Sequence, residues 1–245
     1  MRLTQLIVFI LATVVNFGVQ LFYPSPFDDD GQVYNEPAGY AFSIWGPIFL
    51  GMIIYSVFQM SSKRVESPHL RKATLAGILA GLASIAFVPL SYTGHQPIIL
   101  INLVWHLGAL IWLFVELSEQ VKLETDRRAR WFYLPSQLYL GWISAATAIG
   151  FALALEYVGL NLADSVQINL TAVIIAALAT VAIFMVDRGG GVVALTVVWA
   201  LIGIIVKYGE ISTILYAAIA AILLILATVG LHLRRGGGIV WLPRS

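Results

Sequence analysis

His106 is the only histidine or charged residue near the middle of a long apolar run, which extends from residue 97 to 118. Asn102 precedes it by one helical turn, so a helix would place the two side chains on one face. A polar group at that depth faces the interior of a helix bundle or a cavity. His106 therefore either contacts a ligand or accepts a proton, or it is a neutral imidazole hydrogen-bonded to another helix.

No second catalytic group accompanies His106 in the sequence. The chain has no cysteine, which excludes thiol and disulfide chemistry, and a lone histidine does not make a metal site. Glu116 and Glu156 lie at the ends of apolar runs, where we expect them to reach the membrane interface. An enzyme needs positioned acid–base groups, so the sequence favours a non-enzymatic protein that requires no cofactor.

The composition places the chain in a lipid bilayer. Of its 245 residues 60% are hydrophobic and 11% are charged, and the mean hydropathy is +0.89. A soluble domain of this size cannot bury so much apolar surface. The charges lie between the apolar runs and the net charge is +1, so nothing indicates nucleic-acid binding.

Eight apolar segments are each long enough to cross about 30 Å of hydrocarbon as a helix. None shows the alternation of a β-strand, so the predicted fold is an all-α membrane bundle of about eight transmembrane helices. The first segment has no small-x-small cleavage site and continues to Tyr23, long enough to span, so we expect it to remain as an uncleaved helix. The predicted spans are residues 4–23, 39–60, 73–92, 97–118, 132–155, 166–186, 192–208 and 211–233.

The basic residues predict the orientation of the bundle. With eight spans, every lysine and arginine except Lys207 falls on the side of Arg2. The opposite side carries acidic residues, among them Glu36 and Glu210. Cytoplasmic loops are enriched in lysine and arginine, so both termini are predicted to be cytoplasmic. Because a helical bundle is not an outer-membrane barrel, we predict the bacterial plasma (inner) membrane as its location.

The most distinctive stretch is Asn35-Glu-Pro-Ala-Gly-Tyr-Ala-Phe-Ser-Ile-Trp-Gly-Pro-Ile-Phe49. Pro47 is expected to open the first turn of the second helix or to kink it. Tyr40, Phe42 and Trp45 then lie near the bilayer boundary. They form either an aromatic belt or the wall or lid of a binding pocket, since irregular backbone at membrane depth requires protein or a cavity beside it.

Small and polar residues in other spans could bring helices together. Gly77 and Gly81 form a G-x-x-x-G pattern, which permits close helix approach, although glycine is frequent in membrane helices anyway. Asn16 in the first span and Ser144 and Thr147 in the fifth either join helices by hydrogen bonds or line a pocket.

Three segments resemble the TspO/translocator-protein family, the tryptophan-rich sensory proteins. Pro37 to Phe49 is similar to the family's Pro-Ser-Trp-x-Phe-Gly-Pro-x-Trp stretch before the second helix. Pro89-Leu-Ser-Tyr-Thr-Gly-His-Gln-Pro97 is similar to its turn between helices 3 and 4. Trp142-Ile-Ser-Ala-Ala-Thr-Ala-Ile-Gly-Phe-Ala-Leu153 is similar to its fifth-helix signature, with Gly150 in place of an asparagine.

The resemblance covers the first five spans and predicts a division of the chain. Residues 1–155 are expected to form a TspO-like five-helix bundle, and residues 156–245 to add three transmembrane helices and a short C-terminal tail. The resemblance implies a pocket inside the five-helix bundle, covered by the loop after the first helix. Members of the family bind tetrapyrroles such as protoporphyrin and haem, and some bind sterols.

From these features we expect a membrane receptor or sensor for a hydrophobic, planar, tetrapyrrole-like ligand. A carrier of small apolar solutes, an enzyme acting on a porphyrin or lipid, and a non-catalytic membrane subunit are the alternatives, and a homodimer stays open. The expected ligand-binding residues are Tyr40, Phe42, Trp45, Trp105, His106, Trp142, Ser144 and Thr147.

Overall fold

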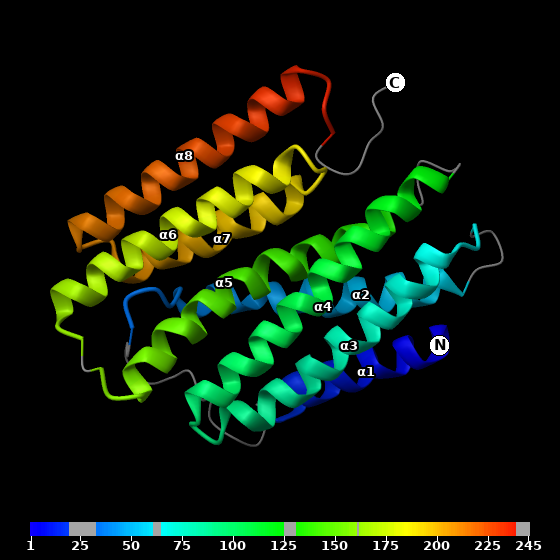
Figure 1. Cartoon of the computed structure of the whole chain (residues 1–245), viewed down its shortest axis with the longest axis horizontal. Helices are drawn as coiled ribbons and strands as arrows, with labels where there is room; N and C mark the ends of the chain where they lie inside the picture. Colours follow the sequence, from blue (N-terminus) through cyan, green and yellow to red (C-terminus); the bar gives the residue numbers. More distant parts are fainter. Residues whose placement is uncertain (20–32, 61–64, 125–130, 161, 239–245) are drawn as a thin grey trace. The chain divides into compact units, whose positions relative to one another are not determined.

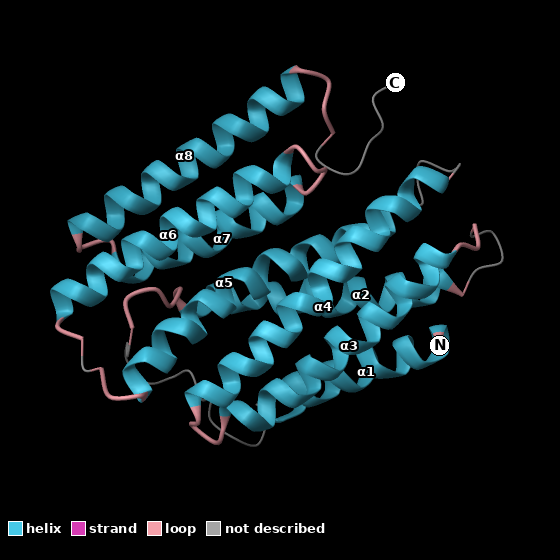
Figure 2. Ribbon diagram, viewed as in Figure 1, coloured by secondary structure: helices cyan, strands magenta, loops and turns pink. Residues whose placement is uncertain are grey.

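The computed structural model describes residues 1–19, 33–60, 65–124, 131–160 and 162–238. These residues form α-helices and short 3₁₀ turns, without a β-strand (Figures 1 and 2). Most of the loop after the first helix, which is the predicted cover of the pocket, and several of the basic loop residues lie outside the described residues. The helices are α1 (Arg2–Gly18), α2 (Trp45–Gln59), preceded by the 3₁₀ helix η2 (Gly39–Ile44), α3 (Pro68–Ser91), α4 (Gln96–Leu123), α5 (Leu134–Tyr157), α6 (Asp164–Val186), α7 (Gly191–Tyr208) and α8 (Ser212–Arg234).

The helices confirm the predicted membrane bundle. Seven helical stretches in the described part of the chain are long and apolar enough to cross a membrane, and α7, with 18 residues, is the shortest of them. The apolar helix α1 has 17 residues among those described. Pro47 lies in the first turn of α2, as its chemistry predicts. The cytoplasmic position of the termini stays a prediction.

The chain divides into two compact units. The first, here called the N-terminal unit, comprises Met1–Asp30 and Trp45–Leu140, and the second, the C-terminal unit, comprises Gly31–Ile44 and Gly141–Ser245. Helix α5 begins in the N-terminal unit and continues in the C-terminal unit. The segment before α2 thus groups with the later helices and not with α1.

In the N-terminal unit, close packing of α1 on α3 confirms the prediction from the G-x-x-x-G pattern. A Cβ atom added at Gly81 would stand 2.5 Å from a methyl group of Val8, and one added at Gly77 would meet the side-chain amide of Gln5. Helix α1 turns Gln5, Phe9 and Asn16 inward and leaves large apolar side chains exposed on its other face. Such an exposed apolar face is what lipid contact requires.

In the C-terminal unit, α6, α7 and α8 pack against one another. The part of α5 that belongs to this unit meets α7 at Gly141, where an added Cβ would stand 2.6 Å from that of Thr196 and 2.8 Å from the carbonyl oxygen of Val193. Thr196 donates to the carbonyl of Val192 within its own helix, so its hydroxyl is satisfied at this contact.

Candidate functional site

The interior of the N-terminal unit is built around Tyr139 of α5, which is fully buried. Its ring receives edge-on contacts from Phe9 of α1 at 6.5 Å and from Trp45 of α2 at 5.7 Å between ring centroids. Phe49 completes this packing and stacks on Trp45 at 5.2 Å. Aromatic pairs at these distances add to the stability gained from burial. The ring of Tyr139 thus links its own helix α5 to α1 and α2.

The hydroxyl of Tyr139 joins two more helices. It shares a hydrogen bond of 2.6 Å with Nε2 of His106 in α4, and the hydroxyl of Ser84 in α3 lies close to it. The side-chain amide of Asn16 in α1 donates to the Ser84 hydroxyl at 3.2 Å and to the carbonyl of Ala12 at 2.8 Å. These polar groups form one buried chain across the unit, from α1 to α4.

This geometry shows the surroundings of His106, whose role as a ligand contact stays a prediction. Its ring nitrogen bonds to another helix, as expected for a structural histidine, and the residue is 1% exposed. Trp105, which the sequence places in the same pocket, is 58% exposed and is not part of the Tyr139 cluster. Neighbouring positions on a helix differ by about 100° in direction, so Trp105 and His106 face different surroundings.

A groove lies between α1 and α3 in the same unit. It has a volume of about 380 Å³ and is lined by Val15 of α1, Val88 and Pro89 of α3, and the residues that follow these helices, Val19 and Tyr92. The lining is apolar apart from the Tyr92 phenol. Because Pro89 carries no N–H, the helix has one backbone donor fewer beside the groove.

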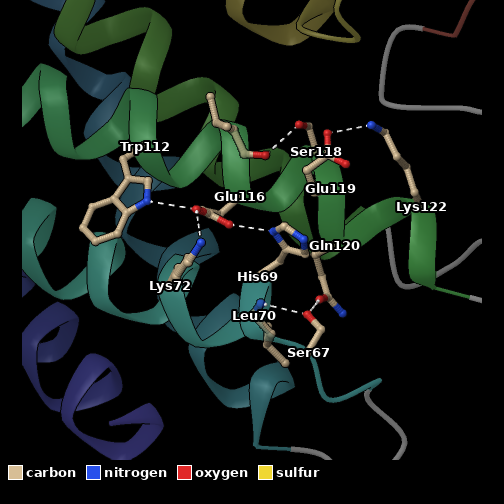
Figure 3. Close-up of polar contacts among 11 residues, drawn as sticks. Ser67, His69, Leu70, Lys72, Trp112, Glu116, Ser118, Glu119, Gln120 and Lys122 are labelled. Atoms are coloured by element: carbon tan, nitrogen blue, oxygen red, sulfur yellow. Dashed lines mark hydrogen bonds and ion pairs between the residues drawn. The ribbon is translucent and has the colours of Figure 1, made fainter.

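Glu116 in α4 holds the second polar cluster of the N-terminal unit (Figure 3). Its carboxylate contacts Nδ1 of His69 at 2.7 Å and Nζ of Lys72 at 3.7 Å, both from α3, and it accepts a hydrogen bond of 3.1 Å from the Trp112 indole. Glu116 is 8% exposed within the protein, and its expected position at the membrane interface stays a prediction. Three donors from two helices compensate the burial of the charge.

A neighbouring network joins the ends of the same helices (Figure 3). The Ser67 hydroxyl caps α3 by accepting from the Leu70 N–H at 3.1 Å, and it also donates to the Gln120 side chain. The amide of Gln120 donates to the Glu124 carboxylate at 2.8 Å, which also accepts from the Tyr133 hydroxyl at 3.0 Å. Among the described residues, no three histidine, aspartate or glutamate side chains come together as a metal-binding group.

In the C-terminal unit, residues 33–44, here called the connecting segment, lie on α7. The Ala38 N–H donates to the carbonyl of Gly203 at 3.0 Å, and the Trp199 indole donates to the carbonyl of Ala41 at 3.0 Å. Gly203 permits this approach, since a Cβ there would stand 2.7 Å from Cβ of Pro37. The Ala38 N–H and the Ala41 carbonyl are thus hydrogen-bonded to α7. Irregular backbone near the bilayer needs such partners.

Charged and aromatic contacts hold both ends of the connecting segment. Lys207 of α7 pairs with Glu36 at 2.7 Å, and their side chains are 27% and 14% exposed. Tyr40 meets Trp199 edge-on at 5.4 Å, and the Tyr208 hydroxyl donates to the carbonyl of Val33 at 2.9 Å. Lys207, the one exception to the charge asymmetry of the sequence, therefore has a structural partner.

The connecting segment also packs against α5. Asn35 donates from its side-chain amide to the carbonyl of Ala148 at 3.1 Å, and Phe42 meets Trp142 edge-on at 5.4 Å. Trp142 is 2% exposed. The segment is therefore fixed between α5 and α7 by backbone, ionic and aromatic contacts.

The comparison with known families agrees with this helical architecture. A family described as TSPO-like protein matches residues 2–231. The chain belongs to the TSPO-like protein family. The match runs through α6 and α7 and into α8, beyond the residues 1–155 on which the resemblance rested. No curated protein and no solved structure matches the chain.

The predicted ligand residues of this TSPO-like protein fall into two groups, one in each unit. Trp45 and His106 meet at Tyr139, whereas Tyr40, Phe42 and Trp142 lie along the connecting segment. Of the two α5 hydroxyls, that of Thr147 donates to the carbonyl of Ile143 in its own helix, and Ser144 is partly exposed.

Several structural residues of the TSPO-like protein were not found from the sequence. Tyr139 and Trp199 lie in apolar runs without a distinguishing neighbour. Lys207 did carry a signal, because it alone departed from the charge asymmetry. The groove residue Tyr92 belongs to the Pro89–Pro97 segment that the resemblance had singled out, although no role was assigned to it.

Proposed function

We propose that this TSPO-like protein is a membrane receptor that binds a hydrophobic, planar ligand of the tetrapyrrole type in the groove between α1 and α3. The observation that carries the proposal is the groove itself. Its volume of about 380 Å³ falls within the range of small-molecule sites, roughly 300–1,000 Å³. Because the volume of the groove is near the lower end of this range, the groove would accommodate one edge of a tetrapyrrole ring. The rest of the ring would lie in the lipid.

The chemistry of the lining supports an apolar ligand with few polar groups. Val15, Val19 and Val88 offer aliphatic contact, and the Tyr92 ring, 38% exposed, can stack on a flat ligand. Pro89 and Tyr92 also belong to the segment that resembles the TspO family, which supports a shared location of the site.

The centre of the N-terminal unit is a less suitable place for a ligand. Tyr139 and Phe49 are fully buried there, and Trp45 stacks on Phe49. A ligand at that position would have to displace close-packed aromatic side chains, whereas the groove is already open. We therefore place the ligand at the groove and assign the Tyr139 cluster to the structure of the bundle.

A titration with groove variants tests the proposal. Protoporphyrin is titrated into the purified protein and its absorbance and fluorescence anisotropy are followed. V15F and V19F put an aromatic ring into the groove and should weaken binding at least tenfold. V14F is the matched control, because Val14 lies on the same helix, is 61% exposed and does not line the groove.

The outcomes separate the candidate functions. Saturable binding that is lost in V15F and V19F and kept in V14F supports the receptor. Equal binding by all variants, or no saturable binding, contradicts the proposed site. Binding accompanied by ligand flux into proteoliposomes would favour the function of a carrier over that of a receptor.

A further inference from the structure

Two glutamines in the N-terminal unit are buried without full hydrogen bonding. Gln5 of α1 and Gln59 of α2 are both 0% exposed. Neither amide atom of Gln5 has a partner among the described residues, and neither does Nε2 of Gln59. Unpaired amide groups inside an apolar bundle are costly, so they indicate a missing partner.

Both amides reach the same face of α3. The Thr74 hydroxyl lies 2.9 Å from Oε1 of Gln59, and the Gln5 amide lies against Gly77, where a Cβ would collide with it. Thr74 and Gly77 are three residues apart and therefore neighbours on the helix surface. Gly77 thus provides the space in which the Gln5 amide approaches α3 beside Gln59.

The unpaired atoms specify the chemistry of the missing partner. Gln5 offers one acceptor and one donor group, and Gln59 offers a donor group. The partner must therefore accept and donate hydrogen bonds, and the complete burial of both residues requires it to be small and neutral. Water has these properties, and buried waters typically make about three hydrogen bonds to otherwise unsatisfied groups.

We propose that the N-terminal unit binds internal water at a site formed by Gln5, Gln59 and Thr74 beside Gly77. The site stands apart from the proposed ligand, since none of these residues lines the groove between α1 and α3. The proposed water site gives Gly77 a role beyond close packing, because the absence of a side chain there leaves room for the Gln5 amide that binds the water. It also explains why two helices of a lipid-facing bundle keep fully buried glutamines.

Water-edited solid-state NMR of the full-length protein in lipid bilayers tests the site. Magnetisation is transferred from water, and the build-up rates of glutamine side-chain amide signals are compared. Gln120 is the matched control: it is 0% exposed in the same unit, and its amide donates to the carbonyl of Val65 and the carboxylate of Glu124. We expect the Gln5 and Gln59 signals to build up at least threefold faster than that of Gln120. Equal or slower build-up would overturn the proposal.

Two variants test whether the glutamines share one site. Gly77→Ala displaces the Gln5 amide, so the Gln5 build-up rate should fall to that of Gln120, whose own rate and shifts report that the fold is kept. Gln5→Leu removes half of the site, so the rate of Gln59 should fall in the same way. If the Gln59 signal still builds up fast in Gln5→Leu, the shared site is overturned, even if Gly77→Ala does not fold.

Discussion

Replacing Lys207 with methionine is expected to loosen the connecting segment from α7 without unfolding the chain. The Lys207–Glu36 pair is the only ion pair between residues 33–44 and α7 among the contacts described, with 2.7 Å between Nζ and Oε2. Methionine keeps most of the aliphatic length and removes the charge. Glu36 is then left partly buried without its cation.

The degree of burial sets the size of the effect. Exposed ion pairs contribute about 0.2–1 kcal/mol, whereas removing one partner of a fully buried pair costs about 3–5 kcal/mol. Side chains that are 27% and 14% exposed lie between these cases, so we expect a cost of about 1–2 kcal/mol. That energy corresponds to a roughly 5- to 30-fold change in the equilibrium between attached and detached segment.

Hydrogen–deuterium exchange of peptides covering residues 33–44 measures this equilibrium. The Ala38 N–H, which is bonded to Gly203, should exchange about 5- to 30-fold faster in Lys207→Met. Lys122→Met is the matched control, because Lys122 pairs with Glu119 on a surface where the side chains are 67% and 43% exposed. It should leave this exchange unchanged.

A double variant separates the pair from other effects of the substitution. The double variant Lys207→Met/Glu36→Gln leaves no charge unpaired. The Ala38 N–H should therefore exchange more slowly in it than the summed free-energy effects of the two single variants predict. Exchange in Lys207→Met within twofold of the wild type, or strictly additive single effects, would refute the role assigned to this pair.

Two further variants test the packing of each unit. Gly203→Ala should destabilise the protein by about 1–3 kcal/mol in thermal or denaturant unfolding, because the new methyl group meets Pro37 and Ala41; Gly230→Ala, with nothing within 4 Å, should be neutral or stabilising by up to about 1 kcal/mol. Tyr139→Phe should cost about 1–3 kcal/mol by leaving Nε2 of the buried His106 without its partner; a loss no larger than that of Trp105→Phe at its exposed position would contradict the central role of Tyr139.

The spans were predictable because membrane crossing sets a minimum length of apolar sequence. Helices α3 to α8 begin and end within a few residues of the predicted positions, and glycine and proline mark the turn at 92–95, where Gly94 has φ of 69°. The sequence also indicated that a helix can approach closely at Gly77 and Gly81, because glycine has no side chain, but it did not indicate that this helix is α1.

The contacts between helices were not predictable from one sequence. Helices that are apolar on all sides carry no periodic signal for the face that turns inward, so the convergence on Tyr139 had no visible cause. The partners of Glu116 are His69 and Lys72, which lie far away in the sequence and had given no sign of this contact. The partner of Lys207 likewise lies in the connecting segment, before α2.

Photoaffinity labelling tests the proposed receptor most directly. A diazirine derivative of protoporphyrin is bound to the protein in bilayers and irradiated, and the labelled positions are mapped by mass spectrometry. We expect saturable labelling, competed by free protoporphyrin, on Val15–Val19 of α1 and Val88–Tyr92 at the end of α3, which form the groove. Competed labelling around Trp45 or Trp142, or label spread over the lipid-exposed faces without competition, would contradict the proposed site.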